Sequence, residues 1–189
     1  MWADVAALLD AGGIEAVTVE LPTIGEQSAG ADFYADARAV RELLDRLEPP
    51  VLLCGHSYGG AVIREAASGP HPAVRELVYV TAAVPGTGDS MVSLMSAAVA
   101  RDADAGEEGV TFRDDGLAFL DHEAARRALF NDCEPERAED GLRRLRPMSL
   151  SGADQPVSDA AWTKLPSVYV RGSEDPMPEG GAGLSRADN

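Results

Sequence analysis

The residue of this 189-residue chain best placed to do chemistry is Ser57, at the centre of the run Gly55-His56-Ser57-Tyr58-Gly59. A serine between two glycines at this spacing is typical of a tight turn that presents a nucleophile. The chemistry it predicts is attack of the hydroxyl on an electrophilic carbonyl. Backbone N–H groups would then stabilise the negative charge that develops on oxygen.

The elements on either side of Ser57 must hold it in place. Residues 51–54 (Val-Leu-Leu-Cys) show no polar alternation, which predicts a short strand buried on both faces. Residues 61–67 are predicted as a helix whose N-terminus lies beneath the serine. We expect Gly55 and Gly59 to be required because the two backbones come too close for a Cβ atom. The spacing does not match the phosphate-binding glycine motifs.

The rest of the chain alternates predicted helices and strands. In order, these are a helix over 2–9, a strand over 16–21, a helix over 33–47, the strand and helix around Ser57, and strands over 77–80 and 167–170. This alternation predicts an α/β fold with a mostly parallel sheet flanked by helices. We interpret residues 1–178 as a single domain and 179–189 as a disordered tail.

Residues 87–161 interrupt the alternation. They are charged, show no convincing strand and contain helical patterns at 121–130 and 136–146. We therefore interpret them as a helical cap inserted over the sheet. Two methionines and a leucine within 91–95 fit either an apolar pocket wall or ordinary core.

Charge and cysteine content narrow the class of protein. The formal net charge of −16 argues against nucleic acid and anionic membranes as partners. The start of the chain lacks the features of a signal peptide, and two cysteines suit a reducing compartment, so a cytoplasmic location is expected. The cysteines and histidines are not spaced as metal ligands, and we expect neither a metal nor a cofactor.

Three stretches of the chain carry a family pattern: residues 55–60 around Ser57, residues 77–85, and residues 172–175 (Gly-Ser-Glu-Asp). Together they resemble the α/β-hydrolase superfamily, in particular its small cap-bearing, esterase-like members. The resemblance implies Ser57 as the nucleophile and the backbone N–H of Tyr58 as one oxyanion-hole donor. The implied substrate is a small apolar ester or a similar small molecule.

The resemblance also implies a carboxylate that orients a histidine. Asp175, which follows the predicted strand 167–170, matches the usual place of this acid. Glu174, its neighbour, is one alternative. Asp89 is a second, because some members of the superfamily place the acid after the preceding strand.

The sequence departs from this family at both ends. The family places its triad histidine after one further strand, and no histidine follows Asp175. It also places a strand and a His-Gly loop, which gives the second oxyanion donor, before the first helix. The sequence is therefore interpreted as truncated, without the N-terminal strands and the C-terminal histidine segment. A fragment, a frameshift or a pseudoenzyme would each give this pattern.

None of the three histidines is an obvious replacement. His56 is expected to point away from the serine, His71 to lie at the opposite end of the sheet, and His122 to lie in the insertion. Without a base, a serine hydroxyl is a weak nucleophile, so we expect ester hydrolysis to be very slow or absent.

Two other functions stay open from the sequence. One is a non-catalytic, small-molecule-binding pseudo-hydrolase that keeps the pocket without the chemistry. The other is a hydroxynitrile-lyase-like enzyme on the same fold, which would need the missing histidine equally. The sequence leaves the oligomeric state open.

Overall fold

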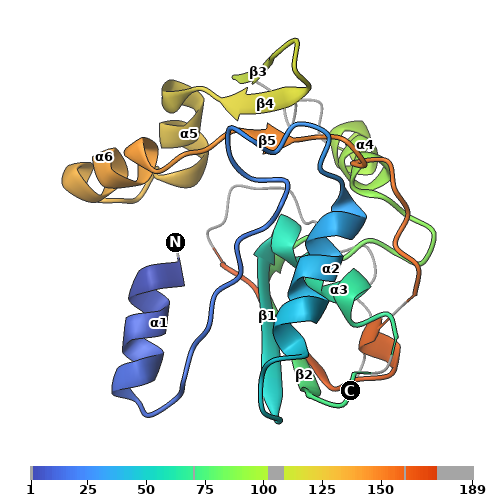
Figure 1. Cartoon of the computed structure of the whole chain (residues 1–189). Helices are drawn as coiled ribbons and strands as arrows, with labels where there is room; N and C mark the ends of the chain where they lie inside the picture. The colour runs from blue at the N-terminus through green and yellow to red at the C-terminus, as the bar shows by residue number, and fades with distance from the viewer. Residues whose placement is uncertain (1, 70, 102–108, 160, 174–189) are drawn as a thin grey trace.

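The computed structural model describes residues 2–69, 71–101, 109–159 and 161–173 (Figure 1). None of the helices in these ranges is long and apolar enough to cross a membrane. The elements are, in chain order, α1 (Trp2–Ala11), α2 (Phe33–Leu44), β1 (Val51–Ser57), α3 (Tyr58–Ala66), β2 (Val74–Ala82), α4 (Met91–Arg101), β3 (Val110–Phe112), β4 (Leu117–Leu120), α5 (His122–Leu129), α6 (Pro135–Arg143), β5 (Met148–Ser149), a 3-10 helix (Ala161–Thr163) and β6 (Ser167–Val170).

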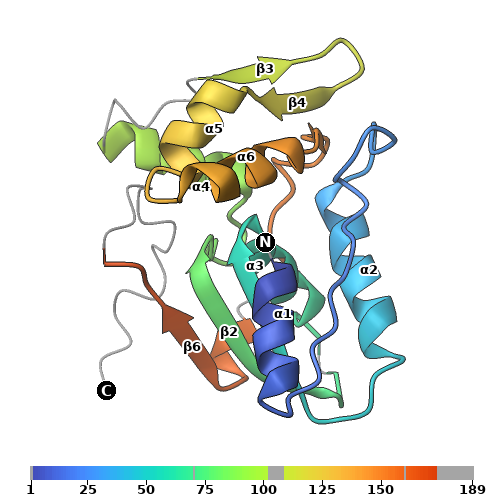
Figure 2. The same cartoon turned by 90° about the vertical axis from the view of Figure 1, so that its left-hand side faces the viewer.

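The central sheet has the strand order β1-β2-β6, and both pairs of neighbours are parallel. Cys54 of β1 pairs with Val78 of β2, which in turn pairs with Val168 of β6. Figures 1 and 2 show α3 against one face of this sheet, α2 packed on α3, and α1 on the opposite side. The predicted mostly parallel sheet with flanking helices is confirmed.

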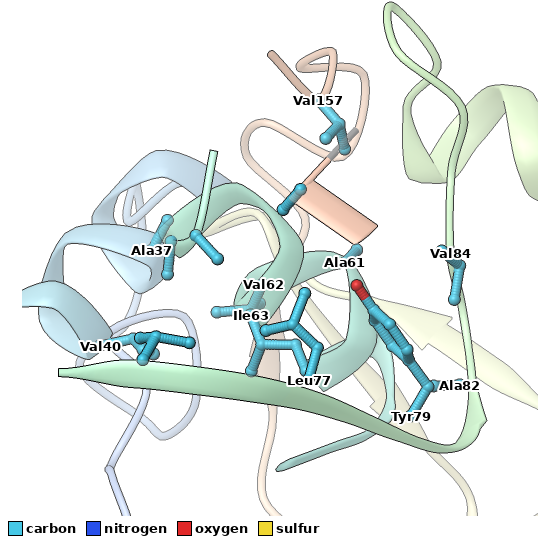
Figure 3. Packing of buried hydrophobic residues seen from close by; sticks show 14 of the residues in the cluster. Ala37, Val40, Ala61, Val62, Ile63, Leu77, Tyr79, Ala82, Val84 and Val157 are labelled. Atoms are coloured by element: carbon cyan, nitrogen blue, oxygen red, sulfur yellow. The ribbon is translucent and has the colours of Figure 1, made fainter. Parts of the chain in front are cut away.

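The core lies between β2, α3 and α2. Figure 3 shows Leu77 of β2 pointing toward Val62 and Ile63 of α3, with Tyr79 pointing toward Ala61. All five of these side chains are at most 4% exposed. Burial of this apolar surface fixes the helix that follows Ser57 onto the strand beside it.

Helix α2 forms because its sequence has both a cap and an apolar stripe. Asp32 is the N-cap, and its Oδ1 accepts a hydrogen bond from the Ala35 N–H at 2.8 Å. Phe33, Val40 and Leu44 fall on one face at helical spacing and are buried against α3 and the sheet. This packing holds α2 beside the start of α3.

The insertion contains strands that its sequence pattern does not predict. β3, β4 and β5 form a small antiparallel sheet, in which Val110 pairs with Leu120 and Ala118 pairs with Met148. These strands are two to four residues long, too short to show a clear period of two. The helical patterns at 121–130 and 136–146 correspond to α5 and α6. Figures 1 and 2 show this layer beyond the ends of β1 and β2 that lead into α3 and α4.

The strand predicted over 16–21 is not present. These residues form no ladder with any other described residue, and Val17 and Val19 are 49% and 36% exposed. A segment with strand propensity forms a strand only where a neighbouring strand supplies hydrogen bonds. Within the described ranges, no strand pairs with residues 16–21.

The prediction that β1 is buried on both faces is also wrong. β1 is an edge strand of the described sheet, Leu52 is 57% exposed and Cys54 is exposed. Val51 and Leu53 pack against the core on the face toward α3, whereas Leu52 and Cys54, on the other face, remain accessible.

Arg64 is an unusual member of the core. Its side chain is fully buried on α3, and within the described residues its one hydrogen bond is a long one of 3.5 Å from Nη2 to Thr87 Oγ1. Nε and Nη1 have no hydrogen-bond partner in the described part of the chain, and neither has the hydroxyl of the adjacent Tyr79. Burial lowers the pKa of Arg64 and raises the pKa of Tyr79 to about 12. The guanidinium is therefore desolvated with incomplete compensation.

Arg64→Met is expected to stabilise the protein by about 1–3 kcal/mol, because an apolar chain of similar length removes the uncompensated buried charge. Urea denaturation followed by circular dichroism measures the change. Arg41→Met is the control, since Arg41 Nη1 donates a short hydrogen bond to the Ala66 carbonyl at 2.5 Å and its loss should destabilise. Negative charges near Arg64, among them Asp159 and Asp89, attract its guanidinium. Destabilisation by both variants would show that this attraction outweighs the desolvation of Arg64.

Candidate active site

Ser57 ends β1 and directly precedes α3, with φ 51° and ψ −127°. Within the described residues, Thr81 is the only other non-glycine residue with positive φ. Such a conformation costs about 1–3 kcal/mol and is held by the surrounding structure. Here the Ser57 carbonyl accepts a hydrogen bond from the Ala83 N–H at 2.9 Å, and the serine is exposed. The turn therefore presents the hydroxyl at the end of the sheet, as predicted.

The glycines around the turn have unequal roles. A Cβ on Gly55 would lie 2.5 Å from the Gly59 carbonyl oxygen, so this glycine is required. A Cβ on Gly60 would lie 2.6 Å from Ala82 Cβ, so α3 approaches the end of β2 only because Gly60 has no side chain. A Cβ on Gly59 would meet nothing within 4 Å. The prediction is confirmed for Gly55 and wrong for Gly59, whose place is taken by Gly60.

Tyr58 has two separate roles in the site. Its backbone N–H is at the first position of α3, where helix N–H groups have no partner within the helix. Its side chain packs edge-on against Phe33, with ring centroids 6.3 Å apart, and its hydroxyl donates to Asp36 Oδ2 at 2.8 Å. Burial, followed by the negative charge of Asp36, raises the pKa of Tyr58, so the phenol stays protonated and remains a donor.

Asp36, on α2, is a functional candidate that the sequence reasoning missed. Its carboxylate is fully buried and accepts three hydrogen bonds. Thr23 donates twice, from its N–H to Oδ1 at 2.9 Å and from its hydroxyl to Oδ2 at 2.6 Å, and Tyr58 is the third donor. The available signal was position: Asp36 lies three residues after Phe33 and four before Val40, on the apolar stripe of its helix.

A cavity of about 750 Å³ adjoins the start of α3. Tyr58, Thr23 and Phe33 form the wall on the side of the sheet, while the start of α4 and the segment around β5 form the other walls. The two methionines of the 91–95 stripe, Met91 and Met95, line this cavity, whereas Leu94 is buried core. The lining residues are Thr23, Phe33, Tyr58, Met91, Val92, Met95, Ser96, Met148, Ser149, Leu150, Ser151, Gly152 and Ala153.

All three histidines of the sequence lie in the described ranges. The ring of His56 packs edge-on against Trp2 with centroids 6.5 Å apart, and His122 is exposed at the start of α5. His71 lies before β2, at the end of the sheet opposite Ser57, and its Nε2 is 3.1 Å from Asp45 Oδ1. Within the described part of the chain, no hydrogen bond joins a histidine to Ser57 Oγ. Among the residues that the structure describes, none of the histidines is therefore paired with the serine.

The candidate acids are placed as follows. Asp89 is exposed, and its Oδ2 accepts a hydrogen bond from the Gly86 N–H at 3.1 Å. This hydrogen bond lies within the turn, after β2, to which Asp89 itself belongs. Asp175 and Glu174 lie outside the described residues. Among the described residues, no group of three or more His, Cys, Asp and Glu side chains could hold a metal ion.

A strand, a serine with positive φ and a helix, beside an apolar cavity, form an arrangement typical of α/β enzymes that use a serine nucleophile. A sequence model described as the alpha/beta hydrolase family matches residues 1–188. The chain belongs to this family, and its fold is the α/β-hydrolase fold.

Individual relatives agree with this assignment. The chain is 29% identical over 173 residues to alpha/beta hydrolase nvfD of Aspergillus novofumigatus, covering 85% of this chain and 67% of that protein. It is 34% identical over 104 residues to a carbendazim hydrolyzing esterase of Nocardioides sp., covering 52% and 43%. Among solved structures, polyneuridine aldehyde esterase superposes with a TM-score of 0.75 at 19% identity, covering 90% of this chain and 73% of that chain. The methylesterase MES16 of Arabidopsis superposes with a TM-score of 0.69 at 22% identity, covering 93% of this chain and 73% of that chain.

Proposed function

We propose that this chain carries the nucleophile and the substrate pocket of a serine esterase acting on small apolar carboxylic esters. The observation that supports this most directly is Ser57, exposed at φ 51° next to Tyr58, which lines the apolar cavity. The insertion, residues 87–161, would act as the cap, because its residues around α4 and β5 form the outer cavity walls. The names of several relatives, esterases and a methylesterase, agree with this substrate class.

The proposed reaction begins with attack of Ser57 Oγ on the ester carbonyl carbon. A C–O bond forms, the carbonyl electron pair moves to oxygen, and the Tyr58 N–H donates to that oxyanion. Collapse then breaks the bond to the leaving alkoxide and leaves an acyl group on Ser57, which water removes. The Thr23 N–H is not a second donor, because it already donates to Asp36.

The slow step of this scheme is removal of the serine proton. In a complete triad a histidine takes this proton and gives it to the leaving alkoxide, and a carboxylate, for which we propose Asp175, orients the histidine. Within the described part of the chain no histidine is hydrogen-bonded to Ser57, so we propose that water accepts the serine proton. We therefore propose that the chain binds esters well and acylates slowly.

Labelling with an alkyl fluorophosphonate tests the nucleophile. The expected result is slow, stoichiometric modification of the peptide that contains Ser57, read by mass spectrometry after hours of incubation. Ser57→Ala removes the hydroxyl and should abolish the label, while Ser90→Ala, at the start of α4, should not. Absence of label on the wild-type chain would contradict a nucleophilic Ser57.

A second candidate function is small-molecule binding without turnover, favoured by the positions of the three histidines. It predicts ligand binding in the cavity that is unchanged by Ser57→Ala, and no fluorophosphonate label. A hydroxynitrile-lyase-like reaction receives no such support, because it needs the same base.

A further inference from the structure

The part of the cavity wall that the structure describes is neutral, but the buried carboxylate of Asp36 lies directly behind it. None of the described lining residues carries a formal charge. Thr23 and Tyr58 belong to this wall, and both donate to the carboxylate of Asp36, which is itself 0% exposed. Asp36 is therefore separated from a bound ligand by one layer of side chains.

Among the described residues, no cationic side chain is paired with this carboxylate. Within the described ranges, no Lys, Arg or His nitrogen lies within ion-pair distance of Asp36, and its three partners are neutral donors. Asp32, four residues earlier on the same side of α2, is different: it is only partly buried and pairs with Arg38 at 3.8 Å. A buried and unpaired charge is poorly screened, so its field extends through the wall.

We propose that Asp36 makes this pocket select against anions: it admits neutral esters and rejects the carboxylates that their hydrolysis produces. The inference rests on the proposed pocket. The raised pKa of the Tyr58 phenol has the same origin in part, since a second negative charge beside Asp36 is disfavoured. A ligand carboxylate next to Tyr58 would meet the same repulsion, whereas an ester or amide would not.

The consequence for a hydrolase is weak product inhibition. Ester hydrolysis converts a neutral ligand into an acid that ionises at neutral pH, and repulsion from Asp36 then speeds its release. Three neutral hydrogen-bond donors hold the Asp36 carboxylate in place, so no cation beside it cancels the field.

The experiment compares a matched neutral and anionic ligand, 2-naphthamide and 2-naphthoate, by isothermal titration calorimetry at pH 7.5. All proteins carry Ser57→Ala, so the result does not depend on whether Ser57 reacts. We expect the amide to bind at least about tenfold more tightly than the acid. Asp36→Asn keeps an acceptor for the Thr23 N–H and removes the charge, so it should strengthen naphthoate binding about tenfold and change amide binding less than twofold.

Asp32→Asn is the control, because this paired carboxylate should have little effect on either ligand and asparagine is as good an N-cap. Equal changes for amide and acid in Asp36→Asn would assign Asp36 a merely structural role and overturn the proposal. If Asp36→Asn does not fold, the two titrations of the Ser57→Ala protein are repeated at 0.5 M NaCl. A preference for naphthamide over naphthoate that persists in salt supports a buried charge, whereas a preference that disappears indicates the net surface charge and contradicts the proposal. Failure of both ligands to bind would contradict the pocket itself, whatever the labelling of Ser57 shows.

Discussion

Gly55→Ala is expected to lower the free energy of unfolding by about 3 kcal/mol, because overpacking against backbone cannot be relieved by a side-chain rotation. The new Cβ would lie 2.5 Å from the carbonyl oxygen of Gly59 and 2.9 Å from the nitrogen of Gly60, both in the first turn of α3. The helix must therefore move away from β1. Urea denaturation followed by circular dichroism measures the loss.

Gly59→Ala is the matched control for this substitution. It adds the same methyl group four residues later, into open space and within a helix, where alanine is favoured over glycine by up to about 1 kcal/mol. The pair should therefore differ by about 3–4 kcal/mol in stability. A Gly55→Ala protein as stable as Gly59→Ala would show that strand and helix are not in contact at this turn, and would remove the basis for the strained Ser57.

The strand–serine–helix unit could be predicted from the sequence because each part has a local signal. Residues 51–54 are a continuous apolar run, and glycines flank Ser57 at fixed spacing. What the pattern could not show is which glycine each backbone contact requires. The motif suggests Gly59, but the close approach to Ala82 involves Gly60, and that contact depends on how β2 lies beside α3.

Asp36 shows a second kind of limit. An aspartate on the apolar face of a helix reads as an exception to the pattern, and only the fold shows that Thr23 and Tyr58 supply its three hydrogen bonds. These residues are 13 and 22 positions away in the sequence, too far for any local pattern to join them. The strands β3 to β5 were missed for a related reason, since such short segments are stabilised by their pairing and not by their own propensity.

The chain is expected to hydrolyse p-nitrophenyl butyrate with a kcat/KM about 10⁴-fold or more below that of enzymes with a complete triad. The reason is the position of the histidines: His71 is at the far end of the sheet, His122 is exposed on α5, and the ring of His56 packs against Trp2. The Tyr58 N–H and the pocket would still stabilise the oxyanion and position the ester. A colorimetric assay of p-nitrophenolate release, with the Ser57→Ala protein as the blank, measures the residual rate.

If removal of the proton from Ser57 Oγ limits the rate, a base added from solution should take the place of a triad histidine. Imidazole at millimolar concentrations is expected to raise the Ser57-dependent rate by about tenfold or more, since general-base catalysis contributes about 10²–10⁴-fold when the base is well positioned and less when it is free. Imidazole also hydrolyses the ester directly, so the rate with Ser57→Ala is subtracted at each concentration. A Ser57-dependent rate that imidazole leaves unchanged would mean that proton removal does not limit the reaction. A wild-type rate equal to that of Ser57→Ala throughout would favour the binding function, because a pocket that only binds gains nothing from a base.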